Sequence, residues 1–269
     1  MYKKEEDMFR ISIHGTKGGV GKSTIALGLA RELALNGREV LFIDRDLLGF
    51  ASFLAGIREY GLLAKAVEGR GPLPLREIRM GRGTLTVLKL FGDGMRFKSD
   101  MAVIHADPAL RAELEVTYRE ILGKRSYHFA VVDNLPLVTP SDDVVRHELE
   151  VFRAVYPSSQ ITRIFVSDSS RFCINDTMNY VRVVESSPDK VGFPGFFVIN
   201  TIPPFRDQEE YLRVLREAKE SLGTKGGVLI PFLEQLFQIK GGLESFPTVP
   251  QIRRMALNLE NGTFEEFIN

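Results

Sequence analysis

A lysine and a serine stand at the end of a glycine-rich segment, residues 15–24, which reads GTKGGVGKST. Glycines let the backbone curl so that successive N–H groups can face phosphate oxygens. Lys22 can neutralise charge on the β- and γ-phosphates of a nucleoside triphosphate, and the Ser23 hydroxyl can ligate Mg²⁺. The segment therefore predicts a phosphate-binding loop, and its predicted contact residues are Gly18, Gly19, Val20, Gly21, Lys22, Ser23 and Thr24.

The flanking sequence supports this prediction. An apolar run, residues 9–14, ends directly before the loop, and a helical pattern, residues 23–35, begins at its end. A helix in that position directs the positive end of its dipole at a bound anion. The strict pattern GxxxxGK[ST] has glycine where this chain has Thr16, but the variant KGGxGK[ST] is complete. Chance would produce the variant with odds on the order of 10⁻⁵ to 10⁻⁴ in such a chain. A glycine-rich turn with incidental lysines is the alternative, and the flanking strand and helix argue against it.

Carboxylates follow two further predicted strands. Asp44 and Asp46 come after four apolar residues, and alternation along an extended chain places both side chains on one side. Asp133 ends the apolar run of residues 129–132, where a carboxylate can hold a Mg²⁺-bound water beside a phosphate loop. Ligands of parallel sheets bind beyond the carboxyl ends of the strands, so these positions suit a site.

A further lysine, Lys17, opens the sequence KGGVGKST. With this lysine the loop resembles the deviant Walker A loop of the ParA/MinD-like ATPases, a P-loop group that includes Soj, Mrp-type carriers, nitrogenase iron protein and ArsA. The resemblance is strongest over residues 9–52, fair over 129–133 and 196–232, and poor over 53–83. It implies an ATP- and Mg²⁺-binding ATPase that dimerises on ATP. In that dimer Lys17 would reach the partner's phosphates, as an arginine finger does; a solvated lysine is the alternative.

The same resemblance implies roles for the acidic residues. Asp46 would orient the attacking water, and Asp44 would support Mg²⁺ and its waters. The implied metal-binding set is therefore Ser23, Asp44 and Asp133. After Asp133 most relatives carry a D-x-P-P or D-x-P-x-G turn, but this chain has one aligned proline, Pro136, and no glycine. The details of the γ-phosphate-sensing switch and the hydrolysis rate therefore stay open.

Asn200 and Pro231 mark the end of the site where the base would bind. Asn200 follows a predicted strand, residues 196–199, as an adenine-reading asparagine does in the family. An asparagine can donate and accept at once, so it can pair with an adenine edge; a turn-forming asparagine is the alternative. Residues 228–232, with Pro231, resemble the family's "IP" strand, after which the chain lines the base pocket.

Short apolar runs alternate with helical patterns along the chain. We predict strands at residues 9–14, 39–43, 84–90, 129–132, 161–166, 196–199 and 227–230, and helices at residues 23–35, 108–122, 143–155, 175–184 and 208–222. This alternation predicts an α/β fold. With the resemblance, it predicts a P-loop NTPase with a mostly parallel central sheet of about seven to eight strands flanked by helices. Residues 1–269 show no repeat or linker, so we expect a single domain.

Composition bears on location and partners. Of the 269 residues, 35 are Lys or Arg and 35 are Asp or Glu, so the neutral total gives no general attraction to DNA or acidic membranes. Residues 1–7 lack the apolar core of a signal peptide, and no run of about 18 apolar residues exists, so we expect a cytoplasmic protein. The mixed charges of residues 206–222 support DNA binding only weakly. The acidic end, residues 255–269, disfavours a C-terminal membrane anchor.

Three functional classes compete: a nucleotide-switched organiser, a metal or Fe–S carrier, and a biosynthetic or maturation enzyme. Such carriers use paired cysteines, and this chain has only Cys173, although a dimer would offer two copies of it. Lys17 counts against the third class, which usually lacks this lysine. We therefore favour a slowly hydrolysing ATPase that organises DNA or cell components, with itself and a stimulating protein as partners. The alternative is an Mrp-like carrier. We expect Cys173 and His14 to be packed residues.

Overall fold

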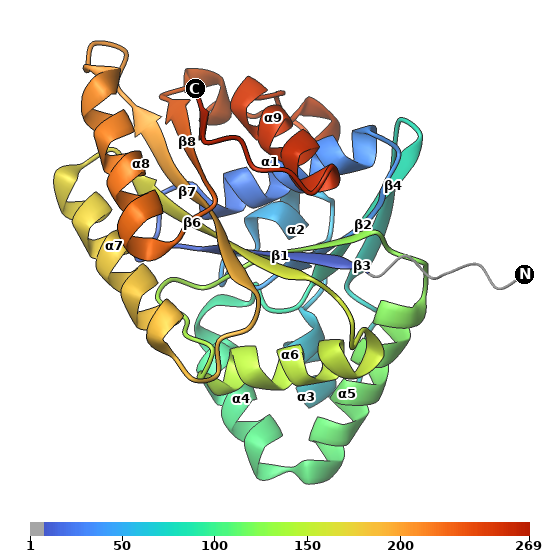
Figure 1. Ribbon diagram of the computed structural model, residues 1–269. Helices are drawn as coiled ribbons and strands as arrows, with labels where there is room; N and C mark the ends of the chain where they lie inside the picture. Colours follow the sequence, from blue (N-terminus) through green and yellow to red (C-terminus); the bar gives the residue numbers. More distant parts are fainter. Residues whose placement is uncertain (1–7) are drawn as a thin grey trace, which may run out of the picture.

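The computed structural model describes residues 8–269; residues 1–7, which carry the signal-peptide prediction, lie outside them. A nine-stranded sheet passes through the described chain in the order β3-β4-β2-β5-β1-β6-β7-β8-β9 (Figure 1). Neighbouring strands are parallel except β3 and β4. The strands are β1 Phe9–His14, β2 Glu39–Asp44, β3 Leu75–Met80, β4 Gly83–Lys89, β5 Phe129–Asp133, β6 Ile161–Asp168, β7 Phe193–Ile202, β8 Gly226–Pro231 and β9 Phe267–Ile268.

Helices cover both faces of the sheet (Figure 1). They are α1 Lys22–Leu35, α2 Phe50–Leu54, α3 Leu62–Glu68, α4 Phe97–Ala106, α5 Pro108–Gly123, α6 Asp143–Val155, α7 Arg171–Ser186, α8 Gln208–Leu222 and α9 Pro250–Glu260. One face packs against α1, α2 and α9, which share a single apolar core with it. The opposite face carries α3 to α6 over β2 and β5, and α7 and α8 over β6 and β7.

The predicted fold class is confirmed. All seven predicted strands and all five predicted helices are present, and α6 and α8 have the predicted bounds. The sheet has nine strands, whereas seven to eight were predicted; the two strands that were not predicted are β3 and β9. β3 lies at the edge, so its sequence LREIRM keeps charged, partly exposed residues, and β9 is only two residues long. Helices α2, α3, α4 and α9 were also missed.

Strand β1 buries apolar side chains on one face of the sheet and polar side chains on the other. Ile11 and Ile13 belong to the core on the α1 face. Because successive side chains alternate across a strand, Arg10, Ser12 and His14 point to the other face, and all three are buried. The central strand therefore carries polar side chains into the layer beneath α6 and α7.

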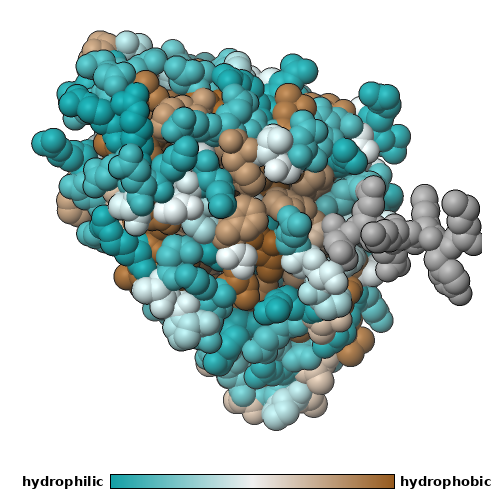
Figure 2. Space-filling view, viewed as in Figure 1, coloured by the Kyte–Doolittle hydropathy of each residue, from teal (hydrophilic) through white to brown (hydrophobic). Residues whose placement is uncertain are grey.

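The surface is ordinary in polarity. Figure 2 shows hydrophilic side chains over most of one face, with an apolar area near its centre. Among residues 8–269, no helix is long and apolar enough to cross a membrane. The acidic C-terminal segment folds as α9 and the edge strand β9, where Glu265 pairs with Arg254 and Glu266 pairs with Lys219.

Candidate functional site

The predicted phosphate loop connects β1 to α1 in the middle of the sheet, where β1 lies between β5 and β6. Gly19 and Gly21 have φ values of 82° and 97°, a left-handed conformation that glycine adopts without steric cost. A Cβ added at Gly18 or Gly19 would meet nothing within 4 Å. A Cβ at Gly21 would lie 2.2 Å from Nδ2 of Asn200. The loop therefore has an open outer side and is tightly supported at its end.

Lys22 is the first residue of α1 and is buried. Its Nζ donates a hydrogen bond of 2.9 Å to the carbonyl oxygen of Lys17, across the curve of the loop. Burial lowers the pKa of Lys22, while the negative charges of Asp133 and Asp46 act in the opposite direction. The ammonium thus lies between the loop and the acidic strand ends, as a phosphate-binding lysine requires.

Asp133, the last residue of β5, is a fully buried carboxylate. Within the described residues, neither of its oxygens has a hydrogen-bond partner. Burial and then repulsion by Asp44 raise its pKa well above the usual range, and the nearby Ser23 hydroxyl and Lys22 offset this only in part. A buried carboxylate without a partner beside a hydroxyl is a suitable place for a hard cation.

The structure supports Mg²⁺ at this place only together with a phosphate. Over residues 8–269 no group of three or more His, Cys, Asp or Glu side chains is arranged to hold a metal. Mg²⁺ at phosphate sites usually takes one or two carboxylates and completes its shell with water and phosphate oxygens. Asp133 and Ser23 fit that pattern.

Asp44 and Asp46 differ in their surroundings. Asp44 is fully buried and accepts three hydrogen bonds, from the Asp46 N–H at 3.1 Å and from the Ser52 N–H and hydroxyl at 2.9 and 2.6 Å. Burial raises the pKa of Asp44 to about 6, although these bonds oppose the shift. Asp46 lies beyond the end of β2, is half-buried, and accepts from the N–H of Leu48. Asp44 thus holds the chain that carries Asp46, and Asp46 is the freer carboxylate.

Arg45, between these aspartates, points into the layer beneath α6. Its guanidinium donates to Oδ1 of Asn134 at 3.0 Å and to Glu148 of α6. Glu148 also accepts two bonds from Arg10 and one from Tyr118. Burial alone would raise the pKa of Glu148, but the two arginines outweigh it and hold the pKa at about 2. This buried arginine cluster joins the segments that follow β2 and β5 to α6.

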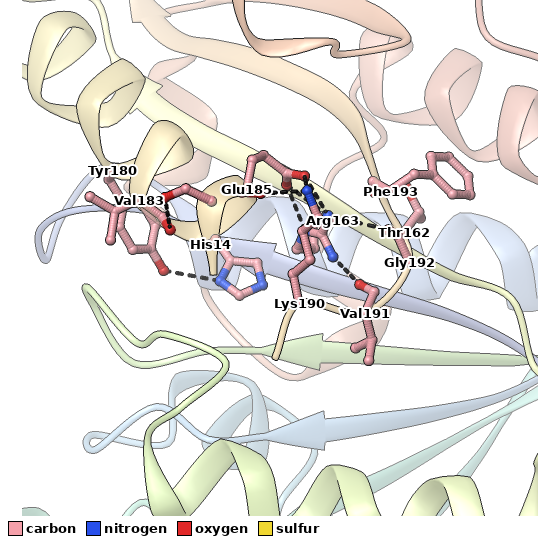
Figure 3. Close-up of polar contacts among 11 residues, drawn as sticks. His14, Thr162, Arg163, Tyr180, Val183, Glu185, Lys190, Val191, Gly192 and Phe193 are labelled. Atoms are coloured by element: carbon pink, nitrogen blue, oxygen red, sulfur yellow. Dashed lines mark hydrogen bonds and ion pairs between the residues drawn. The ribbon is translucent and has the colours of Figure 1, made fainter. Parts of the chain in front are cut away.

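A second buried polar group continues this layer beneath α7 (Figure 3). His14 lies 3.1 Å from the Tyr180 hydroxyl, which donates to the carbonyl oxygen of Val138. Arg163 of β6 pairs with Glu185 at 2.7 Å. Burial and then the charge of Arg163 lower the pKa of His14 to about 3, so the imidazole is neutral. The expectation that His14 is a packed residue is therefore confirmed.

The loop after Asp133 lies directly against the phosphate loop. The N–H of Leu137 donates to the carbonyl oxygen of Gly15 at 3.0 Å. Leu137 has φ 59°, a left-handed conformation that is uncommon for a leucine. The absent glycine noted in the sequence is thus replaced by a leucine held in a strained conformation, of the kind that concentrates at functional switches.

The remaining predicted residues lie around this edge. Lys17 is half exposed, and its ammonium pairs with Oδ2 of Asp168 at 2.6 Å. Asn200 is buried, and its Nδ2 donates to the carbonyl oxygen of Val20 at 2.9 Å. Pro231 ends β8 and is half-buried. Asn200 therefore supports the phosphate loop, and its predicted contact with adenine stays a prediction.

Sequence reasoning missed Arg10, Arg45, Glu148 and Asp168. A signal existed for the first, because β1 reads FRISIH and so places a polar residue at every second position. The others have no local pattern. Glu148 is one of several charged residues on a helix, and Asp168 ends a strand as many aspartates do.

This fold, with a strand–loop–helix phosphate loop at the carboxyl edge of a parallel sheet, defines a P-loop nucleotide-binding protein. The chain belongs to the CobQ/CobB/MinD/ParA nucleotide binding domain family, whose model matches residues 11–230, and it is of the ParA/MinD-like type. The resemblance stated from the loop is confirmed.

Individual proteins are similar to the chain in sequence or in fold. The antiactivator FleN of Pseudomonas aeruginosa is 36% identical over 90 residues, which are 30% of this chain and 32% of FleN, so the match spans about a third of that protein. The cell division protein MinD of Aquifex aeolicus is 21% identical, with 94% of this chain and 97% of that chain covered and a TM-score of 0.59. The septum site-determining protein MinD of Pyrococcus horikoshii, complexed with Mg-ADP, is 20% identical, with 94% and 96% covered and a TM-score of 0.58. The two structures show similarity of fold.

The carrier alternative is not favoured. None of the relatives named above is a metal carrier. Cys173 is 1% exposed and lies in the core beside α1, so two copies of it would not meet at the surface of a dimer. The expectation that Cys173 is a buried packing residue is confirmed.

Proposed function

We propose that this single-domain chain binds ATP with Mg²⁺ and hydrolyses it slowly, and that it acts as a nucleotide-switched organiser. One observation carries the proposal: Lys22 and the unpartnered Asp133 lie together at the mouth of a phosphate loop. Lys22, the loop N–H groups and α1 hold the phosphates, and Asp133 and Ser23 hold Mg²⁺, which offsets phosphate charge. Asp46, the freer acidic side chain, orients the attacking water. That MinD of P. horikoshii is complexed with Mg-ADP supports the choice of ligand.

The edge around the loop also suits a second copy of the chain. Large apolar side chains stand exposed after the carboxyl ends of four parallel strands: Leu48 after β2, Leu137 after β5, Phe172 after β6 and Phe205 after β7. Exposed apolar surface of this kind marks interaction sites. We propose that two subunits meet here on ATP, with Lys17 of each reaching the other's phosphates. ATP then favours the dimer because its γ-phosphate adds charge that only the second lysine offsets.

The atypical loop after Asp133 supports slow turnover. Its strained residue, Leu137, contacts the phosphate loop, so the loop can sense nucleotide, but it lacks the usual glycine. We propose a turnover well below the enzyme median of about 10 s⁻¹, raised by a protein partner. DNA or a cell component is the proposed cargo, and the cytoplasm is the proposed location.

Nucleotide titration tests the binding site. Lys22→Ala should lose most of its affinity for Mg²⁺-ATP, because Lys22 is a buried cation that reaches across the curve of the loop. Lys225→Ala is the matched control, since Lys225 is an exposed lysine before β8, at the opposite edge of the sheet. Near-normal ATP binding by Lys22→Ala would overturn the proposed site.

Light scattering tests the dimer. The Asp46→Ala protein should bind ATP without hydrolysing it, and it should be a dimer with ATP and a monomer with ADP. Adding Lys17→Ala should leave ATP bound and the protein monomeric, because the contacts of ATP with its own subunit remain. If the measured mass does not change with any nucleotide, the proposed dimer is wrong. The chain would then be a P-loop enzyme that shares only the phosphate loop with the ATPases that dimerise.

A further inference from the structure

Asp168 faces the lysine that the proposed dimer uses. Its Oδ2 lies 2.6 Å from Nζ of Lys17, and the two side chains are 23% and 48% exposed. The other oxygen, Oδ1, accepts the N–H of Ser170 at 2.9 Å and its hydroxyl at 2.6 Å. Ser170 is the N-cap of α7, where its hydroxyl oxygen accepts from the N–H of Cys173. The carboxylate is therefore fixed on one side by the start of a helix, and its free oxygen is directed at Lys17.

From this geometry we propose that Asp168 is a positioning residue that holds Lys17 within its own subunit and competes with the partner's phosphates for it. The inference rests on the proposed dimerisation. Lys17 can make only a short-range contact with one anion or the other in a given arrangement. The dimer must therefore break the Lys17–Asp168 pair, and it leaves the Asp168 carboxylate close to the partner's triphosphate, where like charges repel.

The charges around Lys17 agree with this pairing. The hydrogen bond to Asp168 raises the pKa of Lys17, and Asp176 of α7 adds a weaker attraction in the same direction. Lys17 in turn lowers the pKa of Asp168, together with Ser170, although burial opposes the shift. The pair thus keeps both groups charged. To draw Lys17 away from Asp168, the partner subunit must offer it more negative charge than one carboxylate. Bound ATP carries more negative charge than bound ADP and so meets this requirement better.

The Lys17–Asp168 pair should affect both the strength of the ATP dimer and its preference for ATP over ADP. Removing the charge of Asp168 should strengthen the ATP dimer, because Lys17 no longer loses a partner. It should also narrow the difference between ATP and ADP, because a free lysine needs less charge to draw it across. Exposed ion pairs contribute little, so the dimer dissociation constant should fall by about two- to fivefold rather than by orders of magnitude.

The first experiment measures the pair in the monomer. The Lys17 amine is labelled with a limiting amount of an acylating reagent without nucleotide, and modification is quantified by peptide mass spectrometry. Asp168→Asn should increase labelling of Lys17 severalfold, because its amide can still accept from Ser170 but carries no charge. Asp168→Glu should restore part of the protection. Glu220→Gln, which removes an exposed carboxylate of α8, should change nothing. Unchanged labelling in Asp168→Asn would overturn the pairing.

The second experiment measures dimerisation with ATP in the Asp46→Ala background. Asp168→Asn should tighten the dimer, whereas the double variant Asp168→Asn, Lys17→Ala should stay monomeric with ATP, because the lysine that Asp168 would release is absent. If Asp168→Asn weakens the dimer or leaves it unchanged while Lys17→Ala abolishes it, the proposed dimer stands and the competition is wrong. If ATP never produces a dimer, the role in trans fails, and the labelling result alone shows whether the pair exists.

Discussion

Two buried carboxylates, Asp133 on the α1 face of the sheet and Glu148 on α6 over the opposite face, have opposite surroundings. Glu148 accepts bonds from Arg10, Arg45 and Tyr118, and its pKa is held at about 2. Asp133 has no hydrogen-bond partner within the described residues, and its pKa is raised well above the usual range. Burial is the same in both places, so the difference comes from the cations and donors that the fold supplies.

The difference indicates a structural role for Glu148 and a functional role for Asp133. A carboxylate saturated by two buried arginines cannot accept a further ligand, so Glu148 holds α6 against β1 and the segment after β2. A buried carboxylate that the fold leaves without partners reduces stability, and proteins tolerate this cost mainly where an external group completes the site. Arg45 and Asn134 connect the two regions, because they adjoin Asp44, Asp46 and Asp133 in sequence and lie in the arginine cluster.

The largest effect is expected for Glu148→Gln. This change keeps the shape of the side chain but leaves Arg10 and Arg45 buried without their shared counter-charge. Breaking such a buried ion pair costs about 3–5 kcal/mol. Urea denaturation measures the loss, and Glu217→Gln, an exposed glutamate of α8, is the control. A loss below about 1 kcal/mol would mean that the arginine cluster does not stabilise the fold.

Asp133→Asn should act in the opposite direction. Removing an unpaired buried charge should stabilise the ligand-free protein by about 1–3 kcal/mol, and the rise in Tm produced by Mg²⁺-ATP should shrink. Asp100→Asn is the matched control, because Asp100 is also a buried aspartate but is paired with Arg96, and its variant should lose stability. If both variants lose stability alike, Asp133 is a structural residue and the contrast with Glu148 fails.

The sequence-based predictions match the structure where the residues concerned are close together in the chain. The phosphate loop, its strand and its helix are adjacent in the chain, so glycines and lysines at fixed spacing identify them. The arginine cluster joins residues that are 138 and 103 positions apart, and nothing in the sequence tells which helix covers Arg10. The prediction that Asp44 and Asp46 lie on one side stays a prediction, because alternation applies only within a strand. The strand ends at Asp44, and hydrogen bonds from Ser52 and Asp46 set the geometry there.

A smaller effect is expected from His14, which is buried on the same face of β1 as Arg10. Its pKa is lowered from 6.5 to about 3 in the folded protein, so below pH 6.5 the unfolded chain takes up a proton that the folded chain does not. Stability should therefore fall by about 1.4 kcal/mol for each pH unit between about pH 6.5 and pH 3. Urea denaturation at pH 7, 6 and 5 should show a shallower decline for His14→Gln. An equal decline in both proteins would contradict the buried neutral imidazole. His105→Gln, which removes an exposed histidine, is the control.

The smallest effect on stability, and the sharpest test of the site, concerns Asn200. Its amide group supports the phosphate loop through one bond to the carbonyl oxygen of Val20, and it packs against Gly21. Losing that bond should cost about 1 kcal/mol in Asn200→Ala. The second amide hydrogen and the amide oxygen can still pair with an adenine edge, so the preference for ATP over GTP should also fall. Asn36→Ala is the control, because Asn36 donates to Glu260 at the far end of α1. If stability falls while the preference for ATP is unchanged, Asn200 holds the loop and does not read the base. A fall in preference without a loss of stability would mean that the bond to Val20 contributes nothing.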